Sequence, residues 1–81
     1  MQKVEIRLSL AENVKTFVNI VKRYDFDIDL RAGRHVVDAK SILGIFSLDL
    51  SKPISLEIAD DSGKNAADVQ SLLNDIKPFL A

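Results

Sequence analysis

Ser41 is the residue whose type and position best fit a chemical role, because it directly precedes a short apolar run that predicts a helix. A serine at the N-cap of a helix accepts a hydrogen bond from a free backbone N–H group of the first turn. The same helix end favours added negative charge, so phosphorylation of Ser41 would act as a switch. Most serines at helix starts are only caps, and the sequence leaves both interpretations open.

The helix that follows Ser41 is expected to end near Leu50, and it is apolar on more than one side. At the helical period Ile45 and Leu48 fall together, which predicts that both are buried. A second side is also apolar and carries Ile42, Leu43 and Phe46. A short helix cannot bury both sides against one sheet, so we expect the second side to be exposed to a protein partner. The alternative is that this helix only completes the core.

The rest of the chain shows no other catalytic or ligand-binding pattern. It has one histidine, His35, and no cysteine. A single unsupported histidine at the start of a strand does not make a site. No catalytic triad, paired carboxylates, glycine-rich phosphate loop or metal-ligand spacing is found. We therefore predict no catalytic residue, no metal, no cofactor and no enzymatic activity.

Length and composition predict one domain covering residues 1–81. The net charge of −1 gives no electrostatic reason to bind nucleic acid or an anionic membrane. No apolar run is long enough to span a bilayer, and the N-terminal residues alternate charged and apolar types, unlike a signal peptide. Without cysteines there is no disulfide framework. We expect a cytoplasmic monomer.

The elements that position Ser41 can be predicted from periodicity. A first strand alternates charged residues with Val4, Ile6 and Leu8. Ser9 and Glu12 then match a capping box at the start of a helix. The buried face of that helix is expected to carry Leu10, Val14, Phe17, Val18 and Val21. A second strand carries Phe26, Ile28 and Leu30, and the hairpin turn Ala32-Gly33-Arg34 leads to a third strand from His35 to Ala39.

The last part of the chain predicts a strand, a turn and a helix. Pro53 opens the fourth strand, in which Ile54, Leu56 and Ile58 point the same way. The run Asp60-Asp-Ser-Gly63 is typical of a turn. Asn65 would cap a final helix that Pro78 ends. The buried face of this helix is expected to carry Val69, Leu72, Leu73 and Ile76.

The predicted order is βαββαβα, an α+β protein with one sheet covered by helices on one face and open to solvent on the other. A ferredoxin-like fold has a similar order, but it normally uses two long helices of similar size. The brief middle helix argues against it.

The residues around Ser41 resemble a known family. The run Lys40-Ser41-Ile42-Leu43-Gly44-Ile45-Phe46-Ser47-Leu48 is similar to the regulatory-serine segment of HPr, the phosphocarrier of the bacterial phosphoenolpyruvate-dependent sugar phosphotransferase system. The run from Lys22 to Ile28 resembles the end of the first helix and the entry to the second strand of HPr. The resemblance implies an open-faced β-sandwich, with a four-stranded sheet covered on one face by three helices.

The chain departs from the HPr pattern at the start of the first helix. HPr proteins carry a His-Ala-Arg-Pro run there, whose histidine accepts the phosphoryl group and whose arginine neutralises it. The matching residues here are Leu10-Ala11-Glu12-Asn13. The resemblance therefore implies a divergent member without the phosphoacceptor histidine.

The resemblance also implies a regulatory role that does not need this histidine. It assigns phosphorylation to Ser41, through a serine kinase, and assigns partner binding to Lys40, Ile42, Leu43 and Phe46. The implied partners are that kinase, enzymes of the phosphotransferase system or a transcriptional regulator. The leading hypothesis is a protein-binding module switched at Ser41. The alternatives are a degenerate or unconventional phosphocarrier, and a domain with no remaining link to sugar transport.

Overall fold

The computed structural model describes residues 2–59 and 66–81. The elements follow the predicted order and are β1 (Gln2–Ile6), α1 (Ala11–Val21), β2 (Ile28–Ala32), β3 (His35–Asp38), α2 (Ile42–Phe46), β4 (Ile54–Ile58) and α3 (Ala66–Asp75), with a closing 3-10 turn η1 (Lys77–Phe79). The predicted α+β class is confirmed. The expected turn at residues 60–63 and the expected cap at Asn65 lie outside the described residues.

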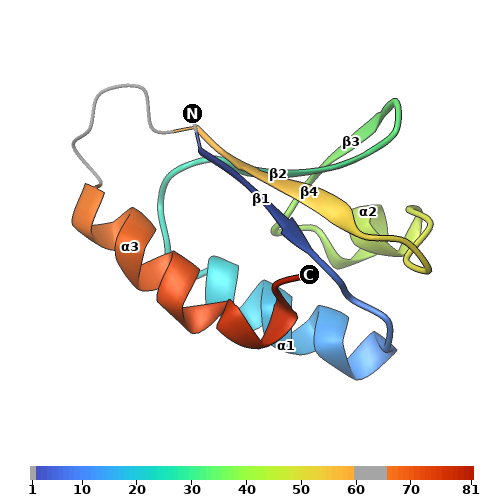
Figure 1. The fold of residues 1–81 in the computed structure, drawn as a ribbon, viewed down its shortest axis with the longest axis horizontal. Helices are drawn as coiled ribbons and strands as arrows, with labels where there is room; N and C mark the ends of the chain where they lie inside the picture. Colours follow the sequence, from blue (N-terminus) through green and yellow to red (C-terminus); the bar gives the residue numbers. More distant parts are fainter. Residues whose placement is uncertain (1, 60–65) are drawn as a thin grey trace.

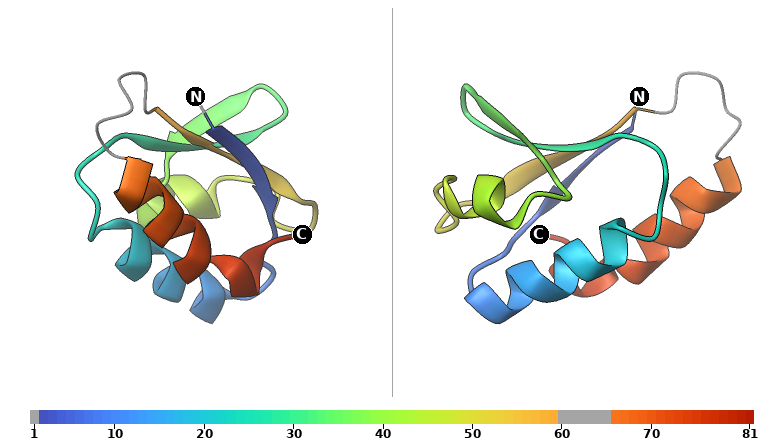
Figure 2. Two further views of the ribbon diagram at one scale, coloured as in Figure 1. Left: turned by 60° about the vertical axis from the view of Figure 1, so that its left-hand side comes forward. Right: turned by 180° about the vertical axis from the view of Figure 1, so that it is seen from behind.

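The four strands form one antiparallel sheet in the order β1-β4-β2-β3. Helices α1 and α3 lie side by side below the sheet and run in opposite directions, while α2 sits at one end, beside β3 and the first half of α1 (Figure 1). Figure 2 shows the same two layers from other sides. The helices thus cover one face only, and the predicted open-faced β-sandwich is confirmed.

The strand register separates an apolar row from a charged row across the whole sheet. Paired positions place Val4, Leu56, Leu30 and Val37 in one row, and Lys3, Glu57, Asp29 and Asp38 in the next. Successive strand residues point to opposite faces, so the first row faces the helices and the second faces solvent. The alternation that predicted the strands therefore also determines which face of the sheet the helices cover.

Glu57 is an exception to the exposure of the open face, because it is only 6% exposed. The Arg31 Nε donates to Glu57 Oε2 at 2.7 Å from the neighbouring strand. This hydrogen bond, opposed in part by desolvation, lowers the pKa of Glu57 below its ordinary value. The same contact raises the pKa of Arg31. The sequence pattern marked this face only as polar and did not reveal the buried acid.

The core lies between the sheet and the helices and contains most of the residues predicted for it. Val14, Phe17, Val18 and Val21 of α1 are buried. Val69 and Leu72 of α3 and Ile76, which follows α3, are also buried, while Leu73 is half-buried against the core. The ring of Phe17 meets that of Phe79 edge-on, with centroids 6.0 Å apart. Such an edge-on contact stabilises the fold beyond the burial of the two rings, and it packs η1 against α1.

The predicted capping box at Ser9 is wrong. Helix α1 begins at Ala11 with Leu10 as its N-cap, and no side chain caps it. The N–H of Arg7 is bonded to the Phe79 carbonyl at 2.7 Å and Leu8 is buried, so the chain cannot enter the helix earlier. Leu10 consequently lies outside the buried face on which it was expected and is 61% exposed.

The β2–β3 hairpin follows the prediction. Ala32 pairs with His35, which leaves Gly33 and Arg34 as a two-residue turn. Gly33 has φ 62°, a left-handed conformation that glycine adopts without steric cost.

Candidate functional site

Ser41 is the N-cap of α2, as predicted. Its extended backbone precedes the helix, and its Oγ accepts a hydrogen bond from the Gly44 N–H at 3.1 Å. A Cβ added at Gly44 would lie 3.2 Å from this Oγ and 3.2 Å from the Val37 Cβ. The glycine therefore lets α2 pack closely against β3 with the serine hydroxyl held between them.

Helix α2 has one buried and one exposed apolar side. Ile45 is 0% exposed and Leu48 is buried, as predicted. Leu43 is 85% exposed and Phe46 is 44% exposed, which agrees with the expected outer side. Ile42 differs from the expectation, because it is half-buried and packs against the core. The exposed apolar surface of α2 is thus formed by Leu43 and Phe46.

The predicted end of this helix near Leu50 is wrong, because α2 ends at Phe46. The N–H groups of Ser47 and Leu48 bond to carbonyls three residues back, at 3.1 and 3.0 Å. This tightening turns Leu48 inward to the core. The Asp49 carboxylate then accepts from the Ser51 hydroxyl and backbone N–H, which bends the chain towards β4 and lowers the pKa of Asp49.

Lys40 anchors the Ser41 segment to the loop between α1 and β2. Its Nζ donates to the carbonyl of Tyr24 at 2.6 Å and to that of Phe26 at 3.2 Å. These bonds occupy two of the three ammonium hydrogens. The partner-binding role of Lys40 stays a prediction, and the structure adds an intramolecular role that the sequence did not suggest.

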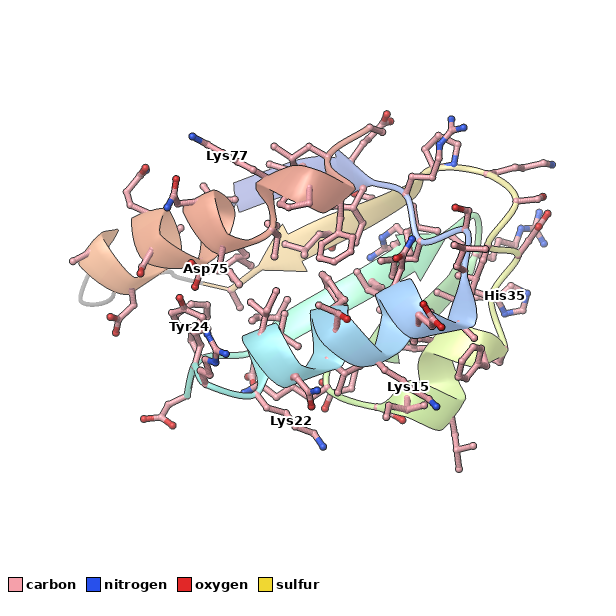
Figure 3. All side chains as sticks on the ribbon, turned by 90° about the horizontal axis from the view of Figure 1, so that it is seen from below. Lys15, Lys22, Tyr24, His35, Asp75 and Lys77 are labelled. Atoms are coloured by element: carbon pink, nitrogen blue, oxygen red, sulfur yellow. The ribbon has the colours of Figure 1, made fainter. Side chains whose placement is uncertain are left out.

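The start of α1 lies at the same end of the molecule as α2 (Figures 1 and 2). Leu10, at the N-cap, therefore adds a third exposed apolar side chain to this end. Sequence reasoning missed it, since the helical period alone placed Leu10 on the buried face. Glu12 is exposed in the first turn, and its carbonyl accepts from the Thr16 hydroxyl at 3.1 Å. Figure 3 shows Lys15 of α1 beside α2.

His35 does not join this group of residues. The tip of the β2–β3 hairpin and the start of α1 lie on opposite sides of α2 (Figures 1 and 2). His35 lines a separate hollow of about 240 Å³, whose other lining residues are Ala32, Gly33, Asp49, Lys52 and Pro53. Over residues 2–59 and 66–81, no group of three acidic, histidine or cysteine residues could hold a metal ion. No helix in that part of the chain is long and apolar enough to cross a membrane.

An open-faced β-sandwich with a serine-capped short helix beside the start of α1 defines the class of HPr-type proteins. A family model described as "PTS HPr component phosphorylation site" matches residues 9–77, and the chain belongs to this family. HPr proteins are phosphocarriers of the phosphotransferase system; they are not themselves enzymes and work with the other proteins of that system.

Two solved structures support the assignment. The chain is similar to HPr-C-His from Thermoanaerobacter tengcongensis, with 25% identity and a TM-score of 0.72, covering 94% of this chain and 90% of that one. It is also similar to the phosphocarrier protein HPr from Bacillus anthracis str. Ames, with 26% identity, a TM-score of 0.64 and coverage of 91% and 92%. No curated protein sequence matches the chain.

Proposed function

We propose that this protein is an HPr-family member without the carrier histidine, a single-domain cytoplasmic module that binds proteins and is switched by phosphorylation at Ser41. The observation that carries the proposal is the group of exposed apolar side chains at one end of the molecule. Leu43 is 85% exposed, Leu10 is 61% exposed and Phe46 is 44% exposed. Exposed apolar groups gathered at one end of a small domain are typical of a protein-binding surface.

The residues at the start of α1 support a role other than phosphoryl transfer. A carrier needs an imidazole as phosphoacceptor and favourable positive charge nearby. The residues at the matching positions are Leu10, Glu12 and Asn13, of which none is basic. Leucine has no nucleophilic atom, and the Glu12 carboxylate would repel a phosphoryl group. The Leu10 side chain instead extends the apolar surface of α2.

Ser41 supports the proposed switch because of where its hydroxyl lies. The Oγ is half-exposed at the junction of β3 and α2, one residue from Ile42 and two from Leu43. A phosphate would add about two negative charges next to the apolar side chains. A partner that packs on Leu43 and Phe46 would then contact a charged phosphate at Ser41, whereas in the unphosphorylated protein it contacts a neutral hydroxyl. The candidate partners are a serine kinase, enzymes of the phosphotransferase system and a transcriptional regulator.

A second candidate, an unconventional phosphocarrier, is favoured by one observation. His35, the sole histidine, shares its hollow with the ammonium-bearing Lys52 and the carboxylate of Asp49. The Lys52 ammonium could neutralise a phosphoryl group on the imidazole, and the Asp49 carboxylate could accept a hydrogen bond that orients the ring. The distance of the hairpin tip from the α1 start speaks against use of the usual docking surface.

Two phosphorylation assays separate the candidates. In the first, the protein is incubated with enzyme I and radiolabelled phosphoenolpyruvate, with the His35→Ala variant as control. In the second, it is incubated with an HPr serine kinase and ATP, with Ser41→Ala as control. The proposal expects label only in the second assay, removed by Ser41→Ala. Acid-labile label from phosphoenolpyruvate that disappears in His35→Ala would establish the carrier instead.

Binding to enzyme I and to the kinase, measured by calorimetry, tests the docking surface. Leu43→Ser and Phe46→Ser should weaken binding at least tenfold without loss of the fold. Val36→Ser is a matched control, because Val36 is a similarly exposed apolar residue that lies opposite Arg31 on the open face of the sheet, whereas α2 packs on the other face. Equal weakening by all three substitutions would show that α2 is not the docking surface.

A further inference from the structure

Strand β3 forms the edge of the sheet opposite to β1, and part of its outer side is unpaired. The Ala39 N–H donates to the Ile28 carbonyl at 2.9 Å, so Ala39 faces β2. Alternate residues of a strand direct their backbone groups to the same side, so Val37 also faces β2, whereas Val36 and Asp38 face outward. The described residues form no hydrogen bond to the outward N–H and C=O groups of Val36. An unpaired edge of this kind is a template for a further strand.

The turns at the two ends of β3 set the length of this unpaired edge. After the strand, the Asp38 carbonyl accepts from the Ser41 N–H at 3.0 Å, and the Asp38 Oδ1 accepts from the Lys40 N–H at 2.8 Å. The second carboxylate oxygen is left for a cation. Before the strand, the edge begins at the exposed turn residue Arg34. An added strand can therefore exchange backbone bonds with Val36 and contact the side chains of Arg34 and Asp38.

The side chains along this edge carry opposite charges at its two ends. Val36 pairs with Arg31 and Asp38 pairs with Asp29, so both lie on the open face of the sheet. Val36 is 45% exposed there. Arg34 lies two positions before Val36, and Asp38 lies two positions after it. Both are exposed, and neither is in an ion pair within the part of the chain that the structure describes.

We propose that two copies of this chain associate through β3, paired antiparallel about a two-fold axis at Val36. The two Val36 residues exchange both of their outward backbone hydrogen bonds, and their side chains meet on the open face. This register brings Arg34 of each copy opposite Asp38 of the other, which forms two ion pairs. Opposite charges that lie directly opposite stabilise a ladder. Leu43 and Phe46 take no part in the pairing, so the proposal does not depend on the function proposed above.

Other registers of the same pairing fit the edge less well. In an antiparallel pair, a residue whose backbone groups face outward must lie opposite another such residue. A two-fold axis at Asp38 would place two carboxylates opposite each other, and an axis at Arg34 would place two guanidinium groups opposite each other. Like charges in these positions destabilise a ladder. An axis at either neighbour of Val36 would place Val36 opposite a charged residue, and no ion pair would form.

The contact is accessible but short. Figures 1 and 2 show the β2–β3 hairpin standing away from α1 and α3, so these helices do not obstruct a second copy. Strand β3 spans only His35–Asp38. Small interfaces are weak and transient, so we expect a monomer at micromolar concentration and a dimer at millimolar concentration. The monomer expected from the sequence is thus the dilute state.

Sedimentation velocity from micromolar to millimolar concentration measures the association, and ¹⁵N NMR of the same samples locates it. The proposal expects the mean mass to rise towards that of a dimer, with shifts of the Val36 and Asp38 amides and none at Lys3 or Leu43. Val36→Pro should weaken dimerisation at least tenfold, because proline lacks the N–H that donates across the axis. An edge strand tolerates proline, so the fold should persist. Val36→Thr is the matched control, because it keeps the N–H and a β-branched side chain.

A charge exchange tests the register. Arg34→Glu and Asp38→Arg should each weaken self-association at least tenfold, because like charges then lie opposite each other in each homodimer. An equimolar mixture of the two variants should associate as tightly as the unmodified protein, because both ion pairs form again between them, one with its charges reversed. Circular dichroism checks the fold of each variant.

Four results would overturn the proposal. The first is a mean mass that does not rise at millimolar concentration. The second is a dimer whose shifts fall at Lys3 or Leu43 instead of Val36, which would place the contact on β1 or α2. The third is unchanged dimerisation of Val36→Pro, and the fourth is a mixture of the two charge variants that associates no better than either variant alone.

Discussion

The two sides of α2 make a direct test of the structure, by comparing Ile45→Ala with Leu43→Ala. The two residues lie in the same five-residue helix, and both are aliphatic with the same number of carbon atoms. Ile45 is 0% exposed and Leu43 is 85% exposed. Helix propensity and position are therefore nearly matched, and burial is the main difference between the two substitutions.

The expected magnitudes follow from burial. Each substitution deletes three carbon atoms, which at about 0.8 kcal/mol per buried methylene is roughly 2.4 kcal/mol for Ile45. The cavity left behind adds to this loss, so we expect Ile45→Ala to lower the free energy of unfolding by about 2–4 kcal/mol. Leu43→Ala should change the free energy of unfolding by less than about 0.5 kcal/mol, since its side chain is mostly in water in both states.

Urea unfolding followed by circular dichroism measures the free energy of unfolding of both variants. A domain of this size has a denaturant slope of about 1–2 kcal/mol per molar urea. Ile45→Ala should therefore lower the urea midpoint by roughly 1–4 M, with Leu43→Ala within about 0.5 M of the unmodified protein. Equal losses at the two positions would refute the two-sided helix, and with it the exposed surface on which the proposed function rests.

Three further predictions concern hydrogen bonds and charge. Arg31 lowers the pKa of Glu57, so the ionised carboxylate stabilises the fold above the ordinary glutamate pKa of about 4.3. This stability is lost as the pH falls through the lower pKa of the folded state. The urea midpoint of Glu57→Gln should therefore lie below that of the unmodified protein at pH 7, and the difference between the two midpoints should narrow by pH 2.5–3. In thermal melts, Ser41→Ala should lower the free energy of unfolding by about 0.5–2 kcal/mol, whereas Ser41→Asp should lower it little, because aspartate caps helices as well as serine does. Equal losses of unfolding free energy in the two variants would show that the hydroxyl does not act as the cap. Tyr24→Phe removes the O–H that donates to Asp75 at 2.8 Å and should cost about 0.5–1.5 kcal/mol. A double-mutant cycle with Asp75→Ala that shows no coupling would mean that the bond is absent in solution.

Local patterns predicted the elements and several of their details. Alternation in residues 4–8 and 54–58 predicted strands and their buried face, because a strand with one covered face must alternate. Gly33 and Ser41 were recognised from the conformations and hydrogen bonds that their residue types favour within a few positions of the chain. The spacing of Ile45 and Leu48 correctly placed both in the core.

Errors occurred where a distant segment decides the local structure. Leu10 fits the helical period of α1, yet the bond between Arg7 and Phe79 delays the start of the helix and leaves Leu10 exposed. Helix α2 has apolar residues to continue towards Leu50, but the chain must turn back to reach β4. Periodicity describes one segment at a time, and it contains no information on these contacts.

The sequence by itself therefore determined the order of the elements, the apolar face of each and the cap at Ser41, since each depends on neighbours within one or two turns. Only the tertiary structure decided the strand order, the burial of Glu57 under Arg31 and the anchoring of Lys40. It alone also formed the hollow between β1 and α3, which is lined in part by Val4 and Leu73. Those features join residues from distant parts of the chain, and they arise from how the sheet pairs and how the helices pack on it.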